Sequence, residues 1–297
     1  MLGLRSLKPP PFIYFAPDTL DEALELLREH GDEAKVLAGG QSLVPLLALR
    51  LARPSVLVDL NRIPGMSDIS ASNGTVIFGA MTRERQAERS ELVRQRVPLL
   101  ADALPLIGHA AIRTRGTVGG SLAHADPAAE LPAVALTLDA TLSVRSAARG
   151  ERTIAASDFF EGFLSTSLHP DEVLTHITFP AARPGTGTSF MEAARRHGDF
   201  AIVGAGTSIT MEGGIVSDAR VVLIGVAGTP LRRPEADRQL VGTSGDAAAV
   251  AAAAATAAAD LAPASDLHGT SAYRRHVAAV MVRRALEQAI SRANGAA

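Results

Sequence analysis

Cysteine is absent from this 297-residue chain, and lysine occurs only at Lys8 and Lys35. Without cysteine the chain can form no disulfide, no thiolate nucleophile and no cysteine-held zinc or iron–sulfur site. Any redox group that it binds must therefore be organic and held without a thiolate. No cysteine chemistry enters the interpretation of this sequence.

An excess of charge of either sign is also missing. The 29 basic and 31 acidic residues give a formal net charge of −2, which provides no electrostatic footprint for nucleic acid or an anionic membrane. No stretch of about 18 strongly apolar residues occurs, and the start, Met1 to Pro11, lacks the apolar segment of a signal peptide. We therefore expect no nucleic-acid partner, no membrane span and a cytoplasmic location.

The length and the 47% of hydrophobic residues favour more than one domain. We predict a first domain over residues 1–180, in two subdomains with a break near residue 60, and a second over residues 188–297. Residues 181–188, rich in proline, glycine and threonine, are the candidate linker. The expected fold class is α+β.

Capping residues and hydrophobic periods predict the individual elements. The predicted helices are residues 18–30, 43–51, 247–259 and 271–293, with a helix-rich region over 84–108. The predicted strands are residues 34–38, 54–60, 75–79, 140–145, 173–179, 201–211 and 219–227. Residues 61–73 are expected to be turn-rich.

The first segment that carries chemistry is the glycine turn of residues 38–42, Ala-Gly-Gly-Gln-Ser, between a predicted strand and helix. Backbone N–H groups converge at such a turn and attract phosphate, and glycine allows the backbone to approach a ligand closely. An ordinary tight turn between strand and helix explains this segment alone equally well.

A second glycine turn, Thr-Val-Gly-Gly-Ser over residues 117–121, precedes an apolar helix that runs to about Leu138. Two such turns could hold two ends of one long ligand. Neither matches the G-x-G-x-x-G dinucleotide fingerprint, and no P-loop, zinc-protease or serine-hydrolase motif occurs. His124, Asp126 and Glu130 lie close together in sequence, but loop and capping chemistry explains them better than a metal site does.

The two glycine turns, in this order and at this separation, resemble the flavin-binding loops of the FAD subunit of carbon monoxide and xanthine dehydrogenases. Three further stretches are similar to that family, so the resemblance spans nearly the whole chain: residues 171–174, 195–203 and 266–275. It implies a two-part FAD-binding domain of the vanillyl-alcohol-oxidase type, followed by a C-terminal domain of antiparallel sheet and helices.

The resemblance also implies how the chain holds FAD. Gly39, Gly40, Gln41 and Ser42 would bind the pyrophosphate, helped by Thr117, Gly119 and Gly120, with Ser121 alongside. Glu130 would bond ribityl or ribose hydroxyls, and Ile107 and Leu174 would pack near the rings. The remaining assigned cofactor-binding residues are Val36, Leu37, Ala38, Leu43 and His124. No residue is assigned a catalytic or metal-binding role.

Three positions depart from the family pattern. Met191 stands where several relatives have a lysine, Gln41 where carbon monoxide dehydrogenases often have histidine, and Glu130 where xanthine dehydrogenases have aspartate. Flavin binding is compatible with all three, but they give no information on the substrate.

The function implied is electron transfer within a molybdenum hydroxylase. A large partner chain would carry the molybdenum cofactor, a small one the [2Fe–2S] clusters, and FAD in this chain would deliver electrons to an external acceptor. A dimer of heterotrimers is the expected assembly. Two alternatives remain open: a self-contained flavin reductase of the same flavin fold, and a binding module that has lost its flavin.

Overall fold

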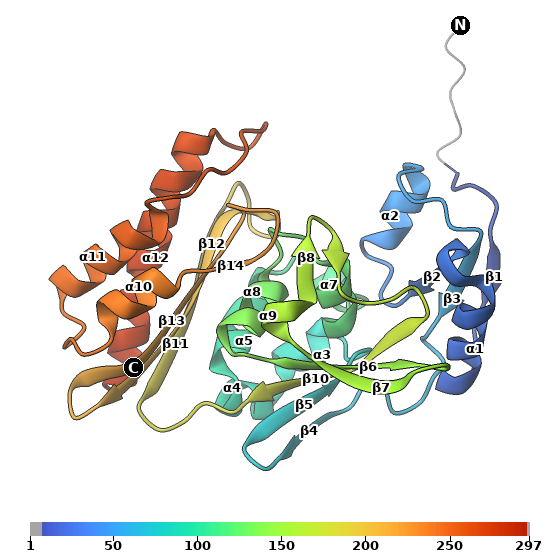
Figure 1. Cartoon of the computed structure of the whole chain (residues 1–297), viewed down its shortest axis with the longest axis horizontal. Coiled ribbons are helices and arrows are strands. Elements are labelled where there is room, and N and C mark those ends of the chain that lie inside the picture. Colours follow the sequence, from blue (N-terminus) through green and yellow to red (C-terminus); the bar gives the residue numbers. More distant parts are fainter. Residues whose placement is uncertain (1–7, 296–297) are drawn as a thin grey trace, which may run out of the picture.

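Four layers make up the protein, as a computed structural model that describes residues 8–295 shows (Figure 1). Three C-terminal helices cover one face of an antiparallel sheet. The other face of that sheet packs on a group of short helices, which in turn lie on a five-stranded sheet. A small parallel sheet with two helices lies at the opposite end from the C-terminal helices. The predicted α+β fold is confirmed.

The small N-terminal sheet is parallel, in the order β1-β3-β2. Its strands are β1 (Ile13–Phe15), β2 (Ala34–Leu37) and β3 (Val56–Asp59), and its helices are α1 (Leu20–His30) and α2 (Leu43–Ala48). A short 3-10 turn, Gly31–Glu33, leads from α1 into β2. Helix α1 begins where the Thr19 side chain accepts a hydrogen bond from Glu22 N, and it ends at Gly31, as its capping residues predict.

The five-stranded sheet is antiparallel, in the order β4-β5-β10-β6-β7. Its strands are β4 (Ile69–Ser72), β5 (Thr75–Gly79), β6 (Thr141–Ser146), β7 (Gly150–Ala155) and β10 (Glu172–Pro180). Between β7 and β10 lie the short helix α9 (Ala156–Phe159) and the strands β8 (Phe160–Gly162) and β9 (Ser165–Thr166). About 90 residues of sequence separate strand β5 from its partner, the central strand β10. The helices between them in sequence therefore belong to the same domain as this sheet.

Short helices fill the space between this sheet and the C-terminal one. They are α3 (Glu84–Arg89), α4 (Glu91–Arg96), α5 (Pro98–Ala103), the 3-10 turn Leu104–Leu106, α6 (Ala110–Arg113), α7 (Val118–His124) and α8 (Glu130–Thr137). All eight residues of α8 are buried, including Glu130 at its first position. Because α8 packs against β12 and β13 on one side and against α5, α7 and α9 on others, it is apolar around its whole circumference rather than along one stripe.

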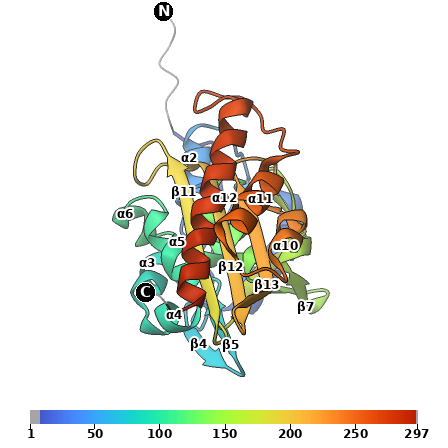
Figure 2. The same cartoon turned by 90° about the vertical axis from the view of Figure 1, so that its left-hand side faces the viewer.

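The C-terminal domain is a four-stranded antiparallel sheet covered by helices. The strands, in order, are β11 (Thr186–Ala194), β12 (Ala201–Glu212), β13 (Ile215–Ile224) and β14 (Leu231–Arg232). The helices are α10 (Pro234–Leu240), α11 (Ala247–Ala258) and α12 (Ser271–Ala293). Figure 2 shows α12 lying across the outer face of β11 and β12.

Two apolar cores hold the layers together. One lies between the C-terminal sheet and helices α10–α12. The other fills the N-terminal domain and extends to Phe190, Val222 and Ile224, which reach it from the inner face of the C-terminal sheet. The middle of the C-terminal sheet therefore contributes side chains to both cores, and apolar side chains of the two domains are in contact.

The predicted elements differ from the structure at several places, and the strands β1 and β7 were not predicted. Strand β11 was not predicted, and it begins at Thr186, inside the candidate linker. Strand β4 lies in the segment expected to be turn-rich, and β13 spans Ile215–Ile224 rather than residues 219–227. Small and polar residues dominate β4 and the first part of β11, so the pairing of these two strands depends on neighbouring strands rather than on a hydrophobic pattern.

Candidate functional site

The first glycine turn forms a loop between β2 and α2 whose N–H groups are free. Within residues 8–295, no protein acceptor receives a hydrogen bond from the backbone N–H of five consecutive residues: Gly39, Gly40, Gln41, Ser42 and Leu43. Gly40 has φ +73°, a conformation that glycine adopts without strain. A row of successive free N–H groups around such a residue is a suitable binding site for an anion.

The second glycine turn packs directly against the first. A Cβ on Gly39 would lie 2.4 Å from the carbonyl oxygen of Arg115, and one on Gly120 would lie 3.4 Å from Cβ of Ala38. Only a residue without a side chain permits the first of these approaches. The two turns therefore form one site, and they do not hold two distant ends of a ligand as the sequence had suggested.

The N–H groups of the second turn are already used. Val118 N donates to Thr82 O at 2.9 Å and Gly119 N to Ala80 O at 2.9 Å, while Gly120 N donates to Thr117 Oγ1 at 3.0 Å. A Cβ on Gly119 would lie 2.6 Å from Ala80 O. The structure thus gives Gly119 a packing role that brings α7 against the end of β5, whereas the sequence suggested a phosphate donor.

A polar network behind the loops ties them together. Asn61 Nδ2 donates to Ala38 O at 2.9 Å, and the guanidinium of Arg83 donates both to Asn61 Oδ1 and to Arg115 O. Asp59, at the end of β3, accepts from Asn61 N at 2.8 Å and from the Tyr14 hydroxyl at 2.6 Å. The network fixes both chain segments that form the site.

Two side chains of this network, Tyr14 and Arg83, have shifted pKa values. The hydrogen bond to Asp59, followed by burial, raises the pKa of Tyr14. Burial, followed by the nearby charge of Arg115, lowers the pKa of Arg83.

Sequence reasoning missed Asp59, Asn61 and Arg83. The available signal was an acid and an amide directly after the apolar strand Val-Leu-Val, where a strand end places polar side chains beside a turn.

The other predicted residues lie around α7. His124 ends this helix, half-buried, and burial lowers its pKa. Leu174 and Ile107 are buried, and Leu174 precedes a register shift in β10 after which Thr175 O accepts a hydrogen bond from Ala80 N at 2.8 Å. Val36 and Leu37 are half-buried on β2. The Ser121 hydroxyl forms no hydrogen bond with any described residue.

Three carboxyl groups of this region have raised pKa values, with burial as the largest cause, and they belong to the buried Glu84 and Glu130 and the half-buried Glu192. The pKa is raised to about 8 for Glu84, to about 8 for Glu130 and to about 7 for Glu192, and the nearby charge of Glu192 raises that of Glu130 further. The Oε2 atoms of Glu84 and Glu192 have no hydrogen-bond partner. Near pH 7 a neutral Glu130 can donate as well as accept a hydrogen bond.

A cleft of about 800 Å³ opens beyond the C-terminal end of α7, between the two domains. Its walls include Asp126–Ala128, Phe163 and Phe200, and it is also lined by Asp266 and Arg274. Arg274 donates to Gly225 O at 3.0 Å and to Asp266 Oδ2 at 2.7 Å, and this hydrogen bond is the largest cause that lowers the pKa of Asp266 to about 2. Gly225 N donates to Pro127 O across the cleft floor at 2.9 Å.

No helix among the described residues is both long and apolar enough to cross a membrane. The same part of the chain contains no group of three or more histidine, cysteine, aspartate or glutamate side chains that could hold a metal ion. His124, Asp126 and Glu130 are thus not gathered into a metal site. The region combines a loop with free backbone N–H groups and a cleft with apolar and charged walls.

Comparison with known proteins identifies two family models in the chain. Residues 10–182 match the FAD binding domain in molybdopterin dehydrogenase, and residues 188–289 match the CO dehydrogenase flavoprotein C-terminal domain. Both glycine turns lie in the first matched range, and residues of both matched ranges line the cleft.

Individual relatives cover the chain almost completely. The 6-hydroxypseudooxynicotine dehydrogenase complex subunit alpha of Paenarthrobacter nicotinovorans is 43% identical, with 97% of each chain covered. A chain of the carbon monoxide dehydrogenase structure from Hydrogenophaga pseudoflava has a TM-score of 0.93 at 42% identity, covering 96% of this chain and 99% of its own. For quinoline 2-oxidoreductase from Pseudomonas putida 86, the TM-score is 0.91 at 40% identity, with 97% and 99% covered.

These matches extend over both domains and over the two glycine turns, at identities well above those that indicate the fold alone. The resemblance drawn from the sequence is confirmed, and the chain belongs to the family of FAD-binding subunits of molybdenum hydroxylases, the carbon monoxide and xanthine dehydrogenase family.

Proposed function

We propose that this chain is the electron exit of a molybdenum hydroxylase and that its first glycine loop holds the FAD pyrophosphate. The observation that carries this proposal is the row of five free N–H groups from Gly39 to Leu43. A pyrophosphate offers several acceptor oxygens and negative charge, which is the ligand chemistry that such a row satisfies. The second turn supports the loop from behind and leaves the Ser121 hydroxyl available beside it.

The direction of α7 supports a position for the rest of the cofactor. The helix leads from the paired turns to Asp126 at the edge of the cleft, over about 10 Å for its seven residues. We infer that Glu130 would hold hydroxyl groups of the cofactor and that Leu174 and Ile107 would pack near its rings. These aliphatic side chains exclude water from a flavin face, and Glu130 in its neutral form bonds a hydroxyl in either direction.

FAD, when bound, supplies the ability to accept and return electrons singly or in pairs. The chain itself contains no cysteine, so clusters held by thiolates have to belong to another polypeptide. We therefore infer a small [2Fe–2S] partner, a large molybdenum-cofactor partner, and an external acceptor that approaches the cleft. A dimer of heterotrimers and a cytoplasmic location remain predictions.

Substrate oxidation is assigned to the partner chain. Relatives of closely similar identity are named for a nicotine derivative, carbon monoxide and quinoline, so the FAD subunit does not carry the choice among them. This variety supports a relay that serves different substrate pockets in different complexes.

Anaerobic stopped-flow absorbance tests the proposal against a self-contained flavin reductase. The FAD-loaded chain alone should keep its oxidised flavin spectrum when mixed with carbon monoxide or N-heterocycles, and the complex with its own partners should lose that spectrum with its substrate. Rapid bleaching of the isolated chain by an organic substrate would favour the self-contained enzyme.

A further inference from the structure

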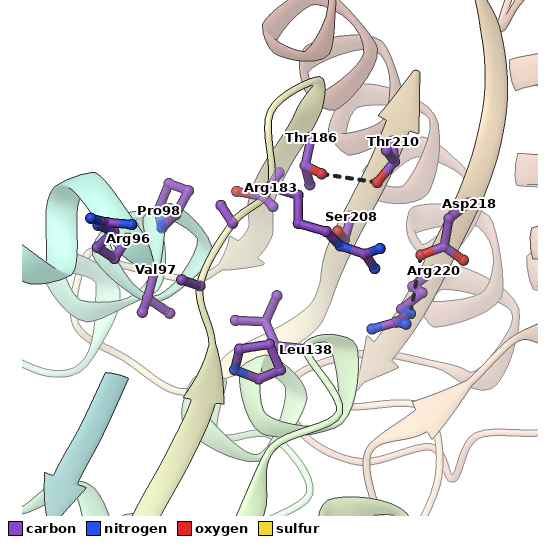
Figure 3. A pocket seen from close by; sticks show the side chains of 14 residues that line it. Arg96, Val97, Pro98, Leu138, Arg183, Thr186, Ser208, Thr210, Asp218 and Arg220 are labelled. Atoms are coloured by element: carbon purple, nitrogen blue, oxygen red, sulfur yellow. Dashed lines mark hydrogen bonds and ion pairs between the residues drawn. The ribbon is translucent and has the colours of Figure 1, made fainter. Parts of the chain in front are cut away.

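A second cavity, distinct from the large cleft, lies where β11 begins, at the opposite end of the same domain boundary. It has a volume of about 50 Å³ and lies between the C-terminal sheet, the linker after β10 and the turn from α4 to α5. Figure 3 shows polar side chains of three neighbouring strands on one side and Leu138, Val97 and Pro98 on the other. None of the residues assigned to FAD lines this cavity.

The register of the sheet explains why its wall is polar. Thr188 pairs with Ser208, and Ser208 pairs with Arg220 on the next strand, so the three side chains lie side by side. Two residues further along, on the same face of the sheet, Thr186 pairs with Thr210, and their hydroxyl oxygens are 2.9 Å apart. The same face carries Phe190 and Val222 in the middle of the sheet. This face of the sheet is therefore apolar in its middle and polar at the end where β11 begins.

Several donors in the cavity wall have no acceptor. Thr188 is 2% exposed, and its Oγ1 forms no hydrogen bond. The Nε of Arg220 is also without a hydrogen bond, with Asp218 Oδ2 3.6 Å away. The guanidinium of Arg183 has no hydrogen bond or ion pair with any residue that the structure describes. Arg183 is exposed to solvent. Buried donors without acceptors, here Thr188 Oγ1 and Arg220 Nε, are unfavourable and are usually satisfied by a bound group.

The charge of the wall indicates the kind of group. Three arginines, Arg96, Arg183 and Arg220, line the cavity together with a single carboxylate, Asp218. Arg220 also pairs with Asp139 at 2.8 Å, whereas the exposed guanidinium groups of Arg96 and Arg183 form no ion pair with any residue that the structure describes. Arginine donors grouped with hydroxyls are typical of sites for phosphate and sulfate.

The size agrees with a small ion. A single water occupies about 10 to 15 Å³ on this measure, so the cavity accommodates a few atoms of oxygen size and no nucleotide. We propose that it binds one tetrahedral oxyanion, phosphate or sulfate, between Arg183 of the linker and Thr188 and Arg220 of the sheet. The ion would bridge the linker to the C-terminal domain and stabilise the boundary between the domains.

Isothermal titration calorimetry of the FAD-loaded full chain tests this site. Phosphate and sulfate are titrated separately, in chloride buffers of matched ionic strength, and bound FAD keeps the glycine loop occupied. Saturable binding of at least one of the two ions, near one per chain and absent for chloride, is expected. Heats equal to those of chloride for both ions would overturn the proposal and leave a water-filled cavity.

Two variants locate the binding. Arg183→Gln should weaken it about tenfold or more, because a hydrogen bond to a charged group is lost, and Thr188→Val about threefold or more at nearly constant volume. Arg284→Gln removes the same charge from exposed α12, on the other face of the sheet, and should change affinity less than about twofold. Flavin absorbance and circular dichroism verify folding. Unchanged affinity in both cavity variants would place the ion elsewhere.

Discussion

At the scale of single residues, glycines of one site perform different tasks. Gly40, with φ +73°, lies within the row of backbone N–H groups that have no acceptor among the described residues. Gly119 donates its N–H to Ala80 and allows α7 to pack against that segment. The sequence shows two similar Gly-Gly pairs, and only the packing separates a ligand-facing glycine from a structural one.

Gly40→Asp should lower the affinity for FAD at least about tenfold while the chain stays folded. The substitution adds a negative charge beside the proposed pyrophosphate position and strains a positive φ by about 1–2 kcal/mol. Gly74→Asp is the matched control, since Gly74 has φ +76° and open space around it in the turn between β4 and β5. Flavin fluorescence titration measures both variants. Equal affinity in the two would remove the pyrophosphate from this loop.

Gly119→Ala should instead destabilise the fold by roughly 2–4 kcal/mol, because the new Cβ would lie 2.5 Å from the Cβ and 2.6 Å from the carbonyl oxygen of Ala80. Gly162→Ala adds the same methyl group with the nearest atom 4.0 Å away, and should be almost neutral. Urea unfolding monitored by circular dichroism compares them. A Gly119→Ala chain as stable as Gly162→Ala would contradict the packing role.

At the scale of elements, the site depends on two loops that are held in contact from behind. The loop from β2 to α2 and the segment before α7 meet through Asn61 and Arg83. Because Arg83 donates to Asn61 Oδ1 and to Arg115 O, its effect on FAD would be one of positioning. The network brings together five separate chain segments, which local sequence patterns do not reveal.

Arg83→Gln should weaken FAD binding about tenfold and raise the rate of FAD release more than it lowers the rate of binding, because the loops are less well fixed. Arg89→Gln is the control, an exposed arginine at the end of α3. Stopped-flow fluorescence gives both rate constants. If the two variants release FAD at the same rate, the network does not position the loops.

The fold was predictable from the sequence where elements have capping or apolar patterns of their own. Helix α1 has a threonine cap, acids in its first turn and a terminal glycine, and its predicted limits agree closely with the structure. Strand β11 reads Thr-Gly-Thr-Ser-Phe-Met-Glu-Ala-Ala and was missed, because its inner face is polar at one end and apolar at the other. Its pairing with β12 and its contact with α12 define it, and these are long-range interactions.

At the scale of the whole molecule, the domains meet around buried acids as well as around apolar side chains. Burial raises the pKa of Glu84 from 4.5 to about 8, so the folded chain holds a proton that the unfolded chain releases between these two pH values. Stability contributed by the neutral form is therefore fully present below about pH 4.5 and is lost as the pH rises toward about 8.

Glu84→Gln should flatten this dependence. Relative to the wild type, the free energy of unfolding of the variant should rise by roughly 2 kcal/mol or more from about pH 5 to about pH 9, since the glutamine does not ionise. Glu29→Gln, on the exposed face of α1, should follow the wild type at every pH. Denaturant unfolding of the FAD-free chain at several pH values provides the comparison. Parallel curves for Glu84→Gln and wild type would show that Glu84 does not ionise in this range.

The central claim is that electrons enter this chain from a separate iron–sulfur partner and leave through FAD. The most direct measurement mixes the chemically reduced [2Fe–2S] partner chain, freed of excess reductant, with the oxidised FAD-loaded chain under anaerobic conditions. The account predicts that the flavin absorbance decreases while the cluster is reoxidised in proportion, and that added acceptor restores the flavin spectrum. A flavin that stays oxidised beside the reduced partner would contradict the account.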